Sequence, residues 1–164
     1  MDIRNVAFDG STGRIRFGSL AIPLTKLGTP KEERKSSKVR LIGDPVARIR
    51  TPGIWDVGDA EFEILVSHWA GYIYPNLPNQ GGSLMDFPIT LVDRHPQVAA
   101  EYHLVLDRCN IMTRSGEYVN DEKERVYKVG YSCIETFEKV AQGQWKSLAW
   151  RPSDGSLSAR ALFT

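Results

Sequence analysis

The chain has 164 residues, and its 41% apolar and 25% charged content is that of an ordinary folded domain with room for one sizeable core. Its 21 lysines and arginines nearly balance its 20 aspartates and glutamates, which leaves a formal net charge of +1. This balance argues against a protein that grips nucleic acid, because tight binding needs many uncompensated phosphate contacts.

The first predicted elements are β-strands divided by a polar stretch. Residues 14–24, "RIRFGSLAIPL", are β-rich, and their Gly and late Pro suit an edge strand or a bulge. Residues 25–38, "TKLGTPKEERKSSK", carry seven charged residues and no aromatic, so we interpret them as a long arm loop that cannot order itself by burial. Two strands follow over 38–42 and 46–50, joined by the turn "GDP".

A regular strand and one helix come next. Residues 59–66, "DAEFEILV", alternate between apolar and acidic side chains, which predicts a half-buried strand. The stretch "SHWAGYIYP" predicts a helix over about 67–74 that Ser67 caps and Pro75 ends. One side of this helix is apolar and carries Trp69, Tyr72 and Ile73.

The second half of the chain holds the longest strands. A short strand over 86–92 precedes two long ones, around 101–112 and 125–140, which a polar loop joins. Strands of this length can extend beyond the domain's own sheet and present edges to a neighbour. We therefore predict a mainly β domain over residues 1–141, an antiparallel β-sandwich or barrel with one flanking α-helix, followed by a C-terminal extension over 142–164.

Signals for membranes and export are missing from the sequence. No apolar run approaches the length of a membrane span. The opening stretch "MDIRNVAFDG" lacks the apolar segment of a secretory signal. We expect no membrane insertion and no Sec-type export.

Residues that could carry out catalysis do not form a recognisable site. The three histidines, His68, His95 and His103, lack the spacing of a helical metal site, and neither cysteine lies near one of them in sequence. The sequence has no phosphate-binding glycine loop and no nucleophile elbow. The acidic loop around Asp121 lacks the alternating ligands and central Gly of a calcium-binding hand. The residues therefore give no positive evidence of catalysis or of a metal site.

The two cysteines raise a question of strand register. In a hairpin centred on Asp121, Cys109 lies opposite Cys133, and Asp107 lies opposite Glu135. Repulsion between the two carboxylates disfavours that register. We expect reduced, partly buried thiols, and a disulfide between them is the alternative.

The order of the elements along the chain is distinctive. Strands split by a long polar arm precede "TPGIWDVGDAEFEI", a Pro-Gly turn that leads into a regular strand. The single helix, "DFPITL" and two long strands follow, with "SGEYVNDEKERVYKVGYS" between and within them. Over residues 10–148 this order resembles that of bacteriophage tail tube proteins, relatives of the tubes inside contractile injection devices. The extension after Gln142 is longer than the family pattern.

The resemblance implies a structural subunit without enzymatic activity. In this family six copies form a ring whose long strands join into an inner β-cylinder, and the rings stack into a hollow tube. Tape-measure protein and genome occupy the lumen, and DNA passes through it on infection. The chain would then belong to the virion tail, assembled in the host bacterial cytoplasm, with sheath, terminator and baseplate proteins as further partners.

The resemblance also assigns roles to residues of this sequence. A long loop at the place of the 25–38 arm contacts the adjacent ring in tube proteins, and here it would become ordered on stacking. Its charged residues are the candidates for that contact: Lys31, Glu32, Glu33, Arg34, Lys35 and Lys38. The lumen of the family is mainly acidic, which nominates three carboxylates: Glu61, Glu63 and Glu101. Aromatic residues of the extension either anchor an interface or cover the domain's own core: Trp145, Trp150 and Phe163.

Three other classes of protein fit parts of the sequence. Another small tail ring component, such as a terminator or connector, would share the fold and form single rings. A monomeric ligand-binding β-barrel would need a closed cavity lined by apolar strand faces. An enzyme would need two histidines, or a histidine and a carboxylate, brought together in a cleft.

Overall fold

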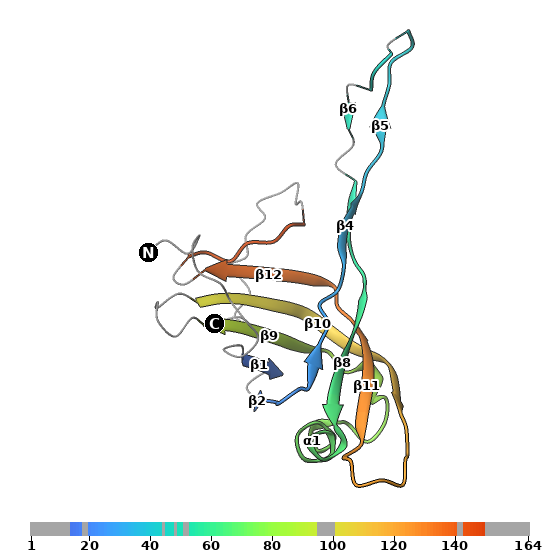
Figure 1. The fold of residues 1–164 in the computed structure, drawn as a ribbon. Helices are drawn as coiled ribbons and strands as arrows, with labels where there is room; N and C mark the ends of the chain where they lie inside the picture. Colours follow the sequence, from blue (N-terminus) through green and yellow to red (C-terminus); the bar gives the residue numbers. More distant parts are fainter. Residues whose placement is uncertain are drawn as a thin grey trace.

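The computed structural model describes residues 14–17, 20–43, 45–47, 49–50, 53–94, 101–140 and 143–149. Antiparallel sheets and one helical segment form a body, and a long hairpin projects from it (Figure 1). This architecture confirms the predicted fold class, a mainly β domain with a flanking helix and antiparallel strands. Three residues singled out from the sequence lie outside the described residues: His95, Trp150 and Phe163.

One long strand, β10 (Glu101–Gly116), belongs to two sheets. Its first half pairs with β9 (Phe87–Arg94) on one side and with β12 (Glu135–Val140) on the other. Its second half pairs with β11 (Val126–Ser132). Between the halves the register shifts at Arg108, whose φ of 51° is left-handed. A bulge of this kind bends a strand, so β10 passes from one sheet into the next.

The remaining strands complete the two sheets around β10. On the β9 side, β1 (Arg14–Phe17) pairs with β9, and β2 (Leu20–Ala21) pairs with β1. On the β11 side, β8 (Asp59–Leu65) pairs with β11, and β3 (Lys26–Leu27) pairs with β8. The predicted strand over 14–24 is thus a short hairpin of two strands.

The core lies between these sheets and the helical segment. The alternation predicted for β8 is present, since Phe62 and Ile64 are buried and Glu61 is exposed. The core also contains Ile89 on β9, Leu106 on β10 and Tyr131 on β11, all without exposed surface. The period of two therefore identifies the buried face of β8 correctly.

The single expected helix is present as a continuous helical segment. It begins with α1 (Val66–His68), continues as a π-helical turn, η2 (Trp69–Ile73), and ends as a 3-10 turn, η3 (Tyr74–Asn76). Trp69 and Ile73 are buried, as their spacing predicts, whereas Tyr72 is 41% exposed. A second 3-10 turn, η4 (Gly82–Leu84), precedes β9. In the described chain no helix has the length and apolarity to cross a membrane.

The prediction that Ser67 caps this helix is wrong. Leu65 occupies the N-cap position and makes no side-chain capping bond. The Ser67 hydroxyl instead donates a hydrogen bond to the carboxylate of Glu124, in the loop between β10 and β11. The helical segment is therefore tied to that acidic loop.

The prediction of one continuous strand over 125–140 is also wrong. The strand is interrupted at Cys133 and Ile134, so that β11 pairs with the second half of β10 and β12 with its first half. The break lies beside the bulge of β10, where the amide of Ile134 donates to the carbonyl of Asp107 (3.0 Å). The interruption of the second strand therefore lies beside the register shift of the first.

A long two-stranded hairpin projects from the body (Figure 1). Near the body β4 (Glu32–Lys35) pairs with β7 (Ile54–Val57), and farther out β5 (Lys38–Val39) pairs with β6 (Ile49–Arg50). The interpretation of residues 25–38 as an unstructured arm is therefore wrong. Backbone hydrogen bonds to the returning strand order this polar segment, and such a ladder needs no apolar burial.

Candidate functional site

The tip of the hairpin carries large apolar side chains in solvent. Leu41 is 54% exposed, Ile42 is fully exposed and Val46 is 65% exposed. Between them Gly43 turns the chain with a φ of 82°. Exposed apolar side chains that cluster in this way mark an interaction surface. Sequence reasoning missed this cluster because it placed the contact in the charged arm, although the run "RLIGDPV" shows apolar residues on both sides of the turn.

The shaft of the hairpin holds most of the charged residues proposed for the ring contact. Lys31, Glu33, Arg34, Lys35 and Lys38 are all exposed. Two ion pairs lie along the shaft, with the Lys35 ammonium 3.1 Å from Asp56 and the Lys31 ammonium 3.6 Å from Glu33. The hydrogen bond to Asp56 raises the pKa of Lys35. These pairs are exposed, so they orient the side chains and add little to stability.

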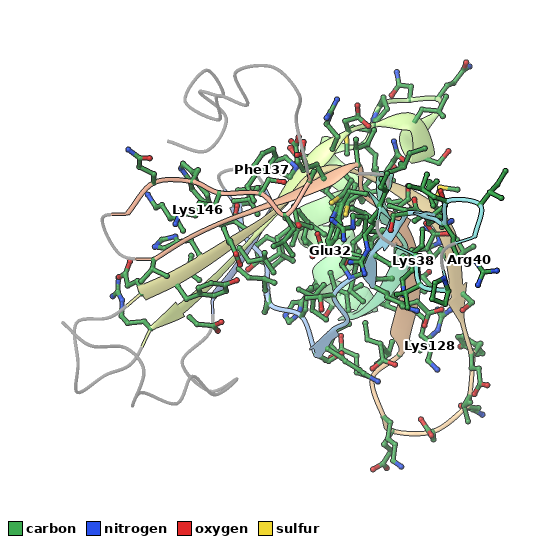
Figure 2. All side chains as sticks on the ribbon, turned by 90° about the horizontal axis from the view of Figure 1, so that it is seen from above. Glu32, Lys38, Arg40, Lys128, Phe137 and Lys146 are labelled. Atoms are coloured by element: carbon green, nitrogen blue, oxygen red, sulfur yellow. The ribbon has the colours of Figure 1, made fainter. Side chains whose placement is uncertain are left out.

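Glu32 differs from the other charged residues of the arm because it faces the body. Its carboxylate accepts hydrogen bonds from the indole of Trp55 (3.2 Å) and from the hydroxyl of Thr136 on β12. Figure 2 shows Glu32 among the side chains of the body, where the hairpin leaves it. Glu32 thus anchors the base of the hairpin.

A second carboxylate lies close to this anchor. The hydroxyl of Tyr102 on β10 donates to Glu138 on β12. Burial, and then the hydrogen bond to Glu138, raise the pKa of Tyr102. Tyr102, Glu138 and Glu32 line a hollow of about 130 Å³ between β12 and the start of the hairpin. The base of the hairpin therefore borders a polar hollow on the body.

The three carboxylates nominated for the lumen lie on two different sheets. Glu61 and Glu63 share the outer face of β8, where Glu63 lies 4.0 Å from the Lys128 ammonium of β11. Glu101 begins β10 in the other sheet and pairs with Arg94 and His103. The hydrogen bond from Arg94, and then that from His103, lower the pKa of Glu101. Glu101 therefore does not extend the stripe formed by Glu61 and Glu63.

The described part of the C-terminal extension packs on its own domain. The backbone of Lys146 exchanges two 2.8 Å hydrogen bonds with Glu138, which adds a bridge to the edge of β12. The Trp145 ring lies 4.9 Å from the Lys139 ammonium and 6.4 Å from the His103 ring. Figure 2 shows Lys146 on this segment beside β12. Trp145 thus covers the domain's own sheet, one of the two alternatives for the aromatic residues.

The cysteines occupy the register that charge repulsion disfavours. Asp107 lies directly opposite Glu135, and both carboxylates are buried. The Arg108 guanidinium approaches Asp107 (3.2 Å) and the Ser147 hydroxyl donates to Glu135 (2.9 Å), so partners compensate the repulsion. Cys109 and Cys133 are buried free thiols, as expected. A hydrogen bond to Cys133, together with burial, raises the pKa of the Cys109 thiol.

In the part of the chain that the structure describes, one edge of β10 has no strand partner over its second half. Beyond Cys109, the described strands pair with β10 only through β11. Met112 on this half is 59% exposed. At the other border of the same sheet, β3 covers β8 over only two residue pairs. Open strand edges present unpaired backbone groups, which another chain can complete.

No cluster suited to metal chemistry occurs in the described ranges. Within them, no group of three or more His, Cys, Asp and Glu residues is arranged to hold a metal ion. His103 contacts Glu101, and the His68 ring lies 5.9 Å from the ring of Tyr72. In the described ranges, the features that lie outside the core are the projecting hairpin and the open strand edges.

Comparison with known proteins shows what this arrangement is similar to. No family model and no curated protein matches the sequence. A chain from the structure of the anti-feeding prophage cap, a tube-terminating cap, gives a TM-score of 0.64 at 8% identity, over 84% of this chain and 93% of that one. Chains from two structures of an extracellular contractile injection system in the extended state also match. The sheath/tube terminator gives 0.61 at 8% identity, over 83% and 99%, and the sheath–tube complex gives 0.59 at 10%, over 84% and 95%.

The chain has a tail tube protein fold. The resemblance inferred from the order of the elements is thus confirmed for the fold. Because each match spans more than nine tenths of the other chain, the tail tube fold accounts for nearly the whole of those proteins.

Proposed function

We propose that this chain is a structural subunit of a tail tube, in which rings of six copies stack into a hollow conduit. The likeness to tube, terminator and cap structures over most of both chains carries the proposal. The open edge of β10 and the short cover of β8 support it, because strands from neighbouring copies can complete both edges in a closed ring. The function is mechanical and requires no cofactor or catalysis.

The projecting hairpin makes the contact between rings in this proposal. Its tip exposes Leu41, Ile42 and Val46, and its shaft exposes the charged residues of the arm. A head-to-tail contact of this kind extends an assembly along an axis, whereas the edge contacts close each ring. The apolar tip supplies buried area, and the charges of the shaft favour the correct orientation.

The lumen in this proposal is lined by the outer face of β8, with Glu61 and Glu63. Their charge would keep DNA mobile, because a wall that paired with many phosphates would hold it. The conduit carries tape-measure protein and then genomic DNA on its way into the host. Its further partners are sheath, terminator and baseplate proteins of a virion tail assembled in the host bacterial cytoplasm.

A terminator or connector ring is the second candidate. The terminator and cap structures match as well as the sheath–tube complex does, with TM-scores of 0.61 and 0.64 against 0.59. Such a component would form the same ring through the same edges but would stop after one layer. The two candidates therefore differ in stacking and not in fold.

Purified full-length chain tests the proposal through its state of assembly. Size-exclusion chromatography and negative-stain electron microscopy should show rings at low concentration and long tubes at high concentration. Rings that never stack would favour the terminator. A stable monomer at all concentrations would contradict both candidates and favour a ligand-binding domain, for which saturable binding of a small apolar ligand would be the positive sign.

A further inference from the structure

The end of the body opposite the hairpin contains an apolar hollow of about 270 Å³. Ile22, Phe62 and Ile73 form its buried part, and Tyr72 and Met85 are more exposed lining residues. Small-molecule pockets occupy roughly 300–1,000 Å³, so this hollow is small for such a ligand. Its size and apolar lining favour aliphatic side chains as the occupant.

The charges on the two ends of the molecule have opposite signs. In the outer half of the hairpin, the described residues 38–43, 45–47 and 49–50 include three basic residues and no acidic one. Residues 117–124, in the loop between β10 and β11, contain four acidic residues and one basic residue. This acidic loop borders the helical segment through the bond from Ser67 to Glu124, and the same segment lines the apolar hollow with Tyr72 and Ile73.

The hairpin tip and the surface formed by the helical segment and the acidic loop cannot meet within one molecule. Figure 1 shows the hairpin leaving the body at the top, with helix α1 and the β10–β11 loop at the bottom. Complementary features at opposite ends make a heterologous contact, which repeats from one copy to the next. An apolar tip with basic flanks therefore matches the helical segment of a second copy, which lines the apolar hollow and is bonded at Ser67 to the acidic loop.

We propose that the hairpin tip of one copy docks into the hollow beside the helical segment of the next copy. Leu41 and Ile42 enter the apolar hollow, and Lys38 and Arg40 face the acidic loop. The inference rests on the proposed function and identifies the receptor for the hairpin on the neighbouring subunit. It commits to a second copy of this chain as the occupant, because this chain itself supplies the complementary tip.

Cross-linking between two differently tagged chains tests the docking. One chain carries Ile42→Cys at the tip, and the other carries Asn76→Cys, an exposed residue that lines the hollow. Mixed at assembly concentration and treated with a short bismaleimide, they should give at least tenfold more covalent heterodimer than a mixture in which Ile134→Cys replaces the Asn76 variant. Ile134 is apolar and 61% exposed but does not line the hollow, so it is a matched control.

The native thiols set the background of this experiment. Cys109 and Cys133 are buried, so a mixture of the tip variant with the unsubstituted chain should give almost no product. A heterodimer no stronger than that of the Ile134 control overturns the inference. Circular dichroism of each variant before mixing shows whether it is folded.

Charge reversal tests the acidic border of the receptor separately. Reversal at the tip, by Lys38→Glu with Arg40→Glu, should lower the cross-link about tenfold, and so should reversal in the loop, by Glu117→Lys with Asp121→Lys. Combining the two reversed chains should restore it, because the pair of charges is then exchanged. Equal cross-linking in all mixtures would contradict the assignment of the acidic loop to the receptor.

The cross-link and the tube are independent readouts. Tubes without the cross-link would leave the proposed function standing and overturn the docking site. A strong cross-link without tubes or rings would support the docking site and contradict the proposed function. The two failures are therefore distinguishable in one set of samples.

Discussion

At the residue scale, hydrogen bonds from buried polar side chains hold neighbouring segments of the chain together. Tyr131 on β11 has no exposed surface, and its hydroxyl donates to the carbonyl of Gly28 (2.6 Å). The amide of Gly28 also donates a hydrogen bond to the backbone carbonyl of Glu61 on β8 (2.8 Å). Gly28 is therefore bonded to two strands of the sheet, β11 and β8. Burial raises the pKa of Tyr131 above the ordinary value for a tyrosine. The start of the hairpin segment is thereby held against the core.

Removing this hydroxyl should cost stability without disturbing the packing. Tyr131→Phe keeps the ring contact with Phe62 but leaves the Gly28 carbonyl without its donor, which should lower the free energy of unfolding by about 1 kcal/mol. Urea denaturation followed by circular dichroism measures the change. Tyr118→Phe is the control, because Tyr118 is 80% exposed and should change stability little. Equal effects of the two substitutions would contradict the role given to the buried bond.

The pairing of Glu101 with Arg94 gives a prediction about pH. The hydrogen bond from Arg94 is the main cause that lowers the pKa of Glu101, so Arg94→Gln should raise that pKa toward the ordinary value for a glutamate. The stability that the pair contributes is present above the ordinary carboxyl pKa and is lost as pH falls through the lowered one. Glu101 is close to solvent, so the effect on stability should be small. Carboxyl chemical shifts followed by NMR during acid titration measure the midpoint, and an unchanged midpoint would exclude Arg94 as the cause.

At the element scale, the hairpin depends on a glycine where its two strands come close. Gly53 has a φ of 69°, and a Cβ placed there would lie 2.0 Å from the Lys35 carbonyl oxygen. Gly53→Ala should therefore open the pairing of β4 with β7, because the clash comes on top of the ~1–2 kcal/mol cost of a left-handed alanine. Hydrogen exchange should speed up in the hairpin and stay unchanged in the body.

A second glycine provides the matched control for this prediction. Gly43 is also left-handed, with a φ of 82°, but a Cβ there would meet no atom within 4 Å. Gly43→Ala should cost only the backbone strain and leave the pairing of β4 with β7 protected from exchange. Similar exchange in the two variants would show that strain alone, and not the close approach at Lys35, controls the hairpin.

Strand β8 and the hairpin show where prediction from sequence succeeds and where it fails. The strand over 59–66 is predictable because one of its faces is buried, which imposes the alternation of Phe62 and Ile64 with acidic residues. The arm over 25–38 has no such pattern, because backbone pairing with a distant segment orders it and burial does not. The role of Glu32 is likewise hidden in the sequence, since its partners Trp55 and Thr136 come from elsewhere in the chain.

At the scale of the whole molecule, the outer hairpin lies apart from the core (Figure 1). The body contains the core cluster, whereas the outer hairpin exposes its apolar residues. Glu32 and the β4–β7 pair form the boundary between these parts. The outer part can therefore be removed with little loss of the core, provided that the boundary is kept.

A shortened hairpin should fold as before and fail to stack. Replacing residues 36–53 by Asn-Gly joins Lys35 to Ile54, which already lie opposite each other, through a two-residue turn suited to a hairpin. The core keeps its contacts, so the thermal midpoint should change by only a few degrees and rings should still form through the strand edges. Tubes should be absent in negative-stain images, because this variant lacks the tip that we propose contacts the next ring. Tubes of normal length from this variant would show that the rings stack through another surface, and the loss of rings would show that the hairpin also closes the ring.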